Sequence, residues 1–204
     1  MAIARLLAQQ LARPSGIAGR VLGTLMDVAN RRPLRLAVDS LAPAVGEKIL
    51  DAGCGTGAAM AEILKRASCH VTGVDASETM LAAARCRLGS RVDLAEAPLE
   101  ALPFEAENFD AVLALNVLYF NDGTNAMLRS LRTVLRPGGR LVAYVTDARS
   151  MADWSFTREG LHRLYDANAL QAAFVDAGFA SDRCTVHEVS VTRRIKGLVA
   201  RAWR

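Results

Sequence analysis

The feature that most constrains the fold is an apolar run followed at once by a glycine-rich loop and a helical pattern. Ile49 and Leu50 are typical of a buried strand, and the loop after them carries Gly53, Gly55 and Gly57 at every second position. Glycines in such a loop let a ligand approach the backbone, and the following helix directs its free N–H groups at that ligand. A plain tight turn is the alternative interpretation, which three glycines in five residues disfavour.

The chain after residue 46 alternates between short apolar runs and helical patterns. The expected strands are Lys48–Asp51, His70–Asp75, Val92–Ala95, Asp110–Leu115, Arg140–Thr146, Cys184–Val191 and Gly197–Trp203. The expected helices are Ala58–Ala67, Ser77–Leu88, Asn125–Leu135 and Ala167–Ala177. This rhythm predicts an α/β fold with a seven-stranded, mostly parallel sheet, an antiparallel last strand and helices on both faces.

The first 45 residues have a helical pattern instead. Apolar residues at helical spacing indicate one helix over residues 1–11 and a second over residues 17–26, separated by Pro14-Ser15-Gly16. Pro33 suits the first position of a third helix, which Pro43 ends.

Helices with an apolar face must bury that face against something. We therefore expect a single domain in which residues 1–45 form an N-terminal helical lid over an α/β core of residues 46–204. Pro14–Asn30 is expected to be the movable part of this lid. A homodimer contact through the same apolar face is the rival interpretation.

The net charge of +4 is concentrated at the two ends of the chain. Residues 1–40 carry six Arg and two Asp, and residues 183–204 carry six basic residues and one Glu. Basic ends are typical of proteins with an anionic partner, such as nucleic acid or a membrane surface. No aromatic residues interleave with these arginines, so helix faces solvated by arginine are the preferred interpretation and a nucleic-acid partner is disfavoured.

Hydropathy and cysteine usage favour a cytoplasmic protein. The longest run without a charged residue, Ala111–Asn121, has eleven residues, whereas a membrane span needs ~20. Arg5 interrupts the first apolar run, so we expect no secretory signal. The four cysteines form no C-x-x-C pair and show no metal-ligand spacing with the histidines, so free thiols and no bound metal are expected.

Two acidic residues follow neighbouring predicted strands. Asp51 ends the first strand and Asp75 the second, at the edge where open α/β sheets bind ligands. A carboxylate after the second strand suits the two hydroxyls of a ribose. Asp51 would repel a pyrophosphate but would favour a cationic ammonium or sulfonium group. Capping of a helix or turn is the alternative role of each Asp.

The run Ile49–Gly57, with Asp75 after the second strand, closely resembles the class I S-adenosylmethionine-dependent methyltransferases. Downstream segments are similar in order to the family's adenine-side loop, fourth strand, post-strand motif and helix–turn–strand signature: Ala97–Phe104, Asn108–Asp110, Asn116–Tyr119 and Leu131–Leu141. The resemblance covers roughly residues 41–180 and implies a Rossmann-like fold. Within the family it points to the small bacterial, ubiquinone/menaquinone-methyltransferase-like "methyltransferase domain 11" type.

The resemblance also implies which residues bind the cofactor, S-adenosylmethionine, whose product is S-adenosylhomocysteine. The implied set comprises Asp51, Gly53, Cys54, Gly55, Asp75, Ala76, Met80, Pro98, Leu99, Asn116 and Leu118. Asp75 would hold the ribose, and Asn116 with Leu118 would lie beneath the methionine part. Many relatives have Asp where Pro98 stands, so adenine binding here would depend on packing and backbone contacts.

The methyl acceptor is a separate question, because the sulfonium already activates its methyl group. The candidates for a general base are Tyr119, His162, Tyr165 and, as a weaker one, Tyr144. A surface or packing role is the alternative for His162. No Pro-Cys and no Asn/Asp-Pro-Pro-aromatic motif occurs, which disfavours enzymes that methylate nucleic-acid bases. A small organic acceptor, either a metabolite or a lipid-like quinone precursor, is expected.

Two other functions remain open at this point. Residues 53–58 also satisfy the relaxed dinucleotide fingerprint, so a nicotinamide-dependent oxidoreductase is one alternative. A nucleotide-binding partner subunit that keeps the fold without turnover is the other.

Overall fold

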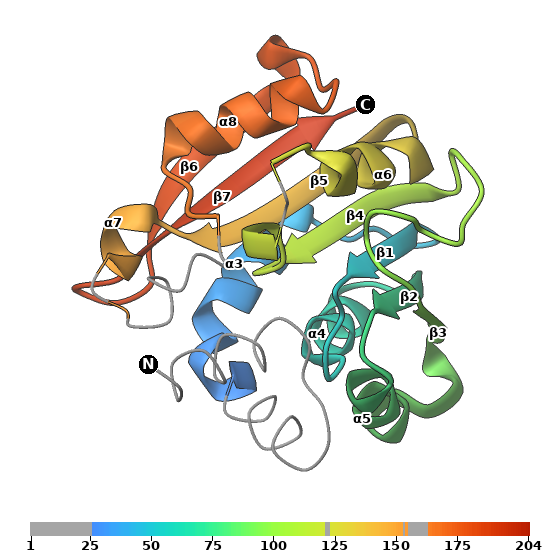
Figure 1. Cartoon of the computed structure of the whole chain (residues 1–204). Coiled ribbons are helices and arrows are strands. Elements are labelled where there is room, and N and C mark those ends of the chain that lie inside the picture. Colours follow the sequence, from blue (N-terminus) through green and yellow to red (C-terminus); the bar gives the residue numbers. More distant parts are fainter. Residues whose placement is uncertain (1–25, 121–122, 153, 155–162) are drawn as a thin grey trace.

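One sheet runs through the computed structural model, which describes residues 26–120, 123–152, 154 and 163–204 (Figure 1). Its strands are β1 (Lys48–Ala52), β2 (His70–Asp75), β3 (Asp93–Glu96), β4 (Phe109–Leu115), β5 (Leu135–Thr146), β6 (Cys184–Ser190) and β7 (Lys196–Trp203). They are ordered β3-β2-β1-β4-β5-β7-β6. Strands β1 to β5 pair in parallel, whereas β7 is antiparallel to both β5 and β6. The predicted seven-stranded α/β sheet with an antiparallel last strand is confirmed.

Helices cover both faces of this sheet (Figure 1). On one face lie α3 (Arg31–Leu41), α4 (Ala58–Arg66) and α5 (Glu78–Leu88), and on the other α6 (Ala126–Val134) and α8 (Ala167–Asp176). The short helical turns are η1 (Gly89–Arg91), η2 (Leu118–Phe120), α7 (Ala148–Met151) and η4 (Ser181–Arg183). Because both faces are covered, the central strands are apolar throughout instead of alternating with polar residues.

Strand β4 shows how one apolar run serves two cores. Val112 and Ala114 pack with α6 and α8, whereas Ala111 and Leu113 pack with α3, α4 and α5. Successive side chains of a strand point to opposite faces, so the run fills both cores at once. None of these four side chains is exposed to solvent.

The start of helix α3 differs from the prediction. The helix begins at Arg31, not at Pro33, and a helical turn over residues 26–29 precedes it. The carbonyl of Asn30 accepts the N–H of Leu34, which lets the helix start before the proline. Since Pro33 lies in the first turn, where backbone N–H groups have no helical partner, its missing donor does no harm there.

The end of α6 and the start of β5 also differ from the prediction. Helix α6 ends at Val134, and Leu135 already pairs with Phe109 before a bulge over residues 136–139. Regular pairing resumes at Arg140, where the strand was expected to begin. A Cβ at Gly139 would lie 2.9 Å from the carbonyl oxygen of Arg136, so only glycine fits this bulge. The other boundaries fall within one or two residues of the prediction.

Arg140 joins the end of α3 to the sheet. Its guanidinium donates to the carbonyl oxygens of Leu41 (2.6 Å) and Ala42 (2.9 Å) and to the Glu47 carboxylate (2.7 and 2.8 Å). The last carbonyls of a helix have no partner within the helix. Arg140 therefore satisfies the C-terminus of α3 and fixes it against β5.

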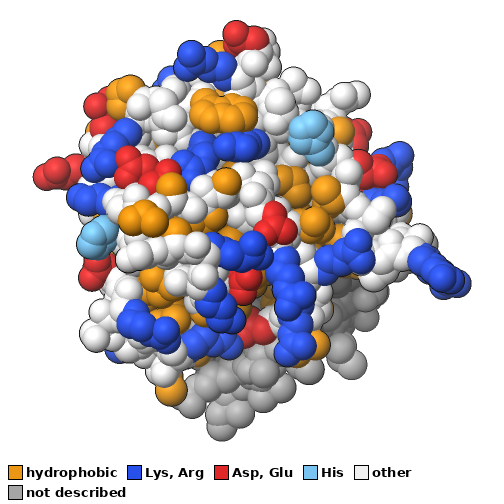
Figure 2. Space-filling view, turned by 180° about the vertical axis from the view of Figure 1, so that it is seen from behind, with side chains coloured by type: hydrophobic (Ala, Val, Ile, Leu, Met, Phe, Trp, Pro, Cys, Tyr) orange, Lys and Arg blue, Asp and Glu red, His pale blue; other side chains and the backbone are white. Residues whose placement is uncertain are grey.

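Figure 2 shows Lys and Arg side chains spread over the rear face, several of them next to acidic side chains. Among the described residues, Arg136 pairs with Asp110 at 2.6 Å and Arg204 with Glu107 at 2.7 Å. None of the described helices is long and apolar enough to cross a membrane. The helices expected over residues 1–11 and 17–26 lie largely or wholly outside the described residues.

Candidate active site

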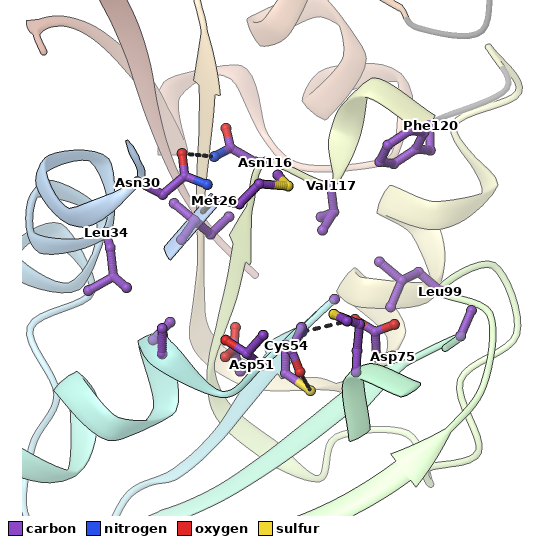
Figure 3. A pocket seen from close by; sticks show the side chains of 18 of the residues that line it. Met26, Asn30, Leu34, Asp51, Cys54, Asp75, Leu99, Asn116, Val117 and Phe120 are labelled. Carbon is purple, nitrogen blue, oxygen red and sulfur yellow. Dashed lines mark hydrogen bonds between the residues drawn. The ribbon is translucent and has the colours of Figure 1, made fainter. Parts of the chain in front are cut away.

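A pocket of about 320 Å³ opens at the carboxyl ends of β1, β2 and β4. This is the edge at which open α/β sheets bind ligands, and the volume lies at the lower end of the range for small-molecule sites. Figure 3 shows Asp51, Cys54 and Asp75 on one side of it, across from Asn30 and Asn116. The described lining residues are Met26, Asp27, Asn30, Leu34, Asp51, Gly53, Cys54, Gly55, Thr56, Ala58, Ala59, Asp75, Ala76, Met80, Pro98, Leu99, Glu100, Leu115, Asn116, Val117, Phe120 and Met127.

The glycine loop forms one wall of the pocket by placing bare backbone there. Gly53 has φ of +71°, and a Cβ on it would overlap with the Val117 side chain. A Cβ at Gly55 would meet no atom within 4 Å. Position 53 therefore has no room for a side chain. Gly55 faces open space, so a ligand can approach the backbone there.

Asp51 is a buried acid with an unsatisfied oxygen. Its side chain is 1% exposed, and among the described residues none forms a hydrogen bond with Oδ2. Burial is the main cause that raises the pKa of Asp51 to about 7, and the negative charge of Asp75 is the second. A hydrogen bond from the Met60 backbone N–H acts in the opposite direction. A buried carboxylate is costly unless it is paired, so Asp51 suits a positively charged ligand group.

Asp75 is held in place by the backbone at the end of β2. One carboxylate oxygen accepts the N–H of Gly55 and the other accepts the N–H of Ser77, each over 2.9 Å. Burial raises the pKa of Asp75, and these backbone N–H groups oppose the rise. Each oxygen keeps a further lone pair, so the oriented carboxylate can accept hydrogen bonds from ligand hydroxyls.

The chain reverses sharply after β4, at Asn116, which has φ of +58°. The turn η2 follows, and residues three apart in such a turn share one face. Val117 and Phe120 accordingly line the pocket, whereas Leu118 is fully buried in the core. Leu118 was expected beside the cofactor, and the structure does not bring its side chain to the pocket. All the other expected cofactor-binding residues line it.

Tyr119 is 8% exposed and is not among the described residues that line the pocket. Its hydroxyl donates to Asn116 Oδ1 over 3.1 Å and accepts the N–H of Thr146 over 2.5 Å. Burial raises the pKa of Tyr119 well above its ordinary range. In this arrangement Tyr119 supports Asn116 and is a poor proton acceptor at neutral pH.

The other candidate bases have different surroundings. Tyr165 is fully buried and donates to the Leu118 carbonyl over 3.3 Å, and Tyr144 is fully buried as well. His162 lies outside the described residues. Among the described residues, no cluster of three or more His, Cys, Asp and Glu is arranged to hold a metal ion.

The segment before α3, together with the start of α3, closes one side of the pocket. The sequence analysis expected Pro14–Asn30 on this side as a movable cover, but it singled out none of the residues there that line the pocket. Met26, Asp27, Asn30 and Leu34 line the pocket. Asn30 Oδ1 accepts the side-chain N–H of Asn116 over 3.0 Å (Figure 3). The helical spacing of these residues was visible in the sequence, but nothing local indicated which residues they meet.

The chemistry of the pocket selects among ligands. Asp27, Asp51, Asp75 and Glu100 line it, and none of its described lining residues is Lys, Arg or His. A pyrophosphate would meet only like charge here. Apolar side chains form the far end, at Leu99 and Phe120 (Figure 3). The pocket suits a ligand with a positive charge, hydroxyl groups and a flat apolar group.

Comparisons with known proteins agree with this description. Residues 49–139 match a family model described as a methyltransferase domain. The chain is 40% identical over 126 residues to the demethylmenaquinone methyltransferase of Clavibacter sepedonicus. The aligned region covers 58% of this chain and 49% of that protein. The chain thus spans about half the length of the curated relatives it matches.

Solved structures share the fold at low sequence identity. A chain from the Haloferax volcanii complex of the Trm112 methyltransferase activator with a methyltransferase has a TM-score of 0.76 at 16% identity, and 96% of each chain is covered. An S-adenosylmethionine-dependent methyltransferase from Mesorhizobium loti has a TM-score of 0.70 at 22% identity, covering 86% of this chain and 98% of that one. Residues 49–139 thus carry a methyltransferase domain, and the chain shares the fold and sheet order of S-adenosylmethionine-dependent methyltransferases.

Proposed function

We propose that this protein is an enzyme that transfers a methyl group from S-adenosylmethionine to a small organic acceptor and releases S-adenosylhomocysteine. The observation that carries the proposal is Asp51, a buried carboxylate whose Oδ2 has no hydrogen-bond partner among the described residues. None of the described residues that line the same pocket is basic. A cationic cofactor satisfies that charge, whereas a dinucleotide would add negative charge to it. This contrast disfavours the nicotinamide-dependent oxidoreductase.

The residues present fit the cofactor. Asp51 would face its ammonium group and Asp75 would accept its ribose hydroxyls. The apolar end at Leu99, Val117 and Phe120 would hold the adenine, without an Asp at position 98 to accept from its amino group. The bound cofactor supplies a methyl group already activated by its sulfonium.

The protein's own contribution is alignment and exclusion of water. The loop backbone and Asn116 border the pocket where the methionine part would lie, so they orient the methyl group toward the acceptor. Tyr119 fixes Asn116 through its hydroxyl and is not needed as a base. Residues 1–45 are proposed to cover this site as part of a single methyltransferase domain that extends over residues 1–204.

The acceptor is proposed to be a small molecule of metabolite or quinone-precursor type. The demethylmenaquinone methyltransferase, a relative at 40% identity, is named for a quinone acceptor, which supports this class. The proposal covers an acceptor whose nucleophilic atom is oxygen, nitrogen, sulfur or carbon. Four free cysteines support a cytoplasmic location, and a homodimer through the N-terminal helices remains part of the proposal.

Calorimetric titration tests cofactor choice directly. We expect the purified protein to bind S-adenosylmethionine and to bind NADH poorly or not at all. Asp51→Asn should weaken S-adenosylmethionine binding, while Asp39→Asn, on the exposed side of α3, should leave it unchanged. Tight NADH binding with no response to S-adenosylmethionine would overturn the proposal.

Turnover is a second, separate test. An acceptor library of phenols, quinols, amines and thiols is incubated with the cofactor, and S-adenosylhomocysteine is measured. Release that depends on one acceptor class identifies the substrate. Cofactor binding without turnover of any acceptor would instead favour the partner-subunit alternative.

A further inference from the structure

Three residues far apart in the sequence form one polar cluster at the rim of the pocket. The Thr56 hydroxyl donates to the Asp27 carboxylate over 2.8 Å and accepts from Nη1 of Arg87 over 2.9 Å. Nη2 of Arg87 donates to Asp27 Oδ2 over 2.6 Å. Each member therefore contacts the other two, and we refer to Asp27, Thr56 and Arg87 as the rim cluster.

The rim cluster joins three elements that surround the pocket. Asp27 lies in the turn before α3, Thr56 in the glycine loop and Arg87 in the last turn of α5. Asp27 and Thr56 themselves line the pocket, and Thr56 is 7% exposed. The Asp27 and Arg87 side chains are 24% and 37% exposed, so their charges are only partly screened by solvent.

A second contact holds the same turn at the opposite end. Asn30, three residues after Asp27, accepts from Asn116 at the end of β4. Residues three apart lie on one side of a helical turn, so both side chains face the site. The turn is fastened to the glycine loop at one point and to the post-strand segment at the other.

From this arrangement, and resting on the proposed function, we propose that Asp27 and Arg87 are positioning residues for the cofactor. They act through Thr56, fixing the glycine loop, and they hold the turn over residues 26–30 across the pocket. Neither residue takes part in methyl transfer. Their loss should therefore weaken cofactor binding and speed its release, with little effect on turnover once the site is saturated.

The test uses Asp27→Asn and Arg87→Met in the full chain. We expect either change to raise KM for S-adenosylmethionine and its dissociation rate constant by about tenfold, with kcat within about twofold of wild type. Thr56→Val, which removes the shared hydroxyl at similar volume, should act in the same direction. The matched control is Arg85→Met on the same helix, since Arg85 forms an ion pair with exposed Glu78 at 3.7 Å and lines no part of the pocket that the described residues form.

A charge-exchanged variant separates positioning from loss of folding. In Asp27→Arg/Arg87→Asp the two charges change places, and Thr56 can still donate to one partner and accept from the other. We expect this double variant to recover part of the affinity lost in each single charge-reversal variant. Equal KM and dissociation rates in wild type, Asp27→Asn and Arg87→Met would overturn the inference. Failure of the wild type itself to bind S-adenosylmethionine would instead overturn the proposed function.

Discussion

Asp51 lies one residue before the end of β1 and Asp75 ends the neighbouring parallel strand β2, and the charge of Asp75 adds to burial in raising the pKa of Asp51 to about 7. Both carboxylates face one pocket. Asp75 has a backbone N–H donor on each of its oxygens, whereas Asp51 Oδ2 has no donor among the described residues. Near neutral pH the Asp51 carboxyl is therefore poised between its neutral and its charged form. A cationic ligand favours the charged form of Asp51, which couples ligand binding to proton release.

Cofactor affinity should rise with pH through the neutral range. Only the ionised form of Asp51 attracts the ammonium group. As the pH is raised toward 7, the Kd for S-adenosylmethionine should therefore decrease by up to about tenfold per pH unit, and above about pH 8 it should become constant. Calorimetry at pH 6, 7 and 8, in buffers of different ionisation enthalpy, measures both the Kd and the protons released. Asp51→Asn should give a flat profile. A wild-type Kd that does not change from pH 6 to 8 would contradict this assignment.

The same pKa predicts that Asp51→Asn stabilises the ligand-free protein at high pH. The folded carboxyl keeps its proton up to about pH 7 and the unfolded one only to about 3.8, so wild-type stability falls as pH rises between these values. At pH 8 the variant should gain up to about 4 kcal/mol in free energy of unfolding, and the gain should vanish below about pH 4. Urea denaturation at several pH values measures this difference, and a variant less stable than wild type at pH 8 would refute it.

Removing the Asp75 carboxylate should weaken cofactor binding. Asp75→Ala should cost about 1.5–3 kcal/mol of binding free energy, the usual loss for hydrogen bonds to a charged group. This corresponds to roughly 10- to 150-fold in Kd. Equilibrium binding of S-adenosylmethionine measures the loss, with circular dichroism as the control for folding. A folded variant with unchanged affinity would remove Asp75 from the site.

Tyr119→Phe should lower the free energy of unfolding but change kcat only slightly. Without the hydroxyl, the Thr146 N–H and Asn116 Oδ1 lose a partner, which should cost about 1–3 kcal/mol of unfolding free energy. Burial raises the pKa of Tyr119, so its phenolate is scarce at neutral pH and kcat should stay within about threefold. Denaturation and a pH–rate profile measure the two effects. If the variant lost a rise in rate with pH that the wild type shows at alkaline pH, Tyr119 would be assigned to catalysis as a base after all.

Arg140→Met should destabilise the fold without touching the pocket. The change removes the ion-pair partner of half-buried Glu47. It also removes the guanidinium N–H donors to the carbonyl oxygens of Leu41 and Ala42. Together these losses should lower the free energy of unfolding by on the order of 3 kcal/mol. Arg66→Met, which breaks more exposed ion pairs, is the control and should change stability little. Thermal unfolding compares the two, and equal effects would contradict the role given to Arg140.

Much of the fold was predictable because its signals are local. The strands and helices after residue 46 follow from short apolar runs, from Ser77 as an N-cap and from glycines that end helices. Asp51 and Asp75 were predictable site residues because each lies within one residue of the carboxyl end of its strand. Parallel strands bring those ends to one edge of the sheet, so position along the chain already implied position in space.

The tertiary structure decided which residues meet across long stretches of chain. Asp27 and Arg87 are 60 residues apart, and Asn30 and Asn116 are 86 apart, so no local pattern encodes either contact. Leu118 shows the same limit on a smaller scale, because the left-handed turn at Asn116 directs Val117 to the pocket and Leu118 to the core. The sequence by itself determined the sheet, the glycine loop and its two acids, since propensity and periodicity act over a few residues. The pKa of Asp51 and the rim of the pocket depend on packing among distant elements, which only the folded chain brings together.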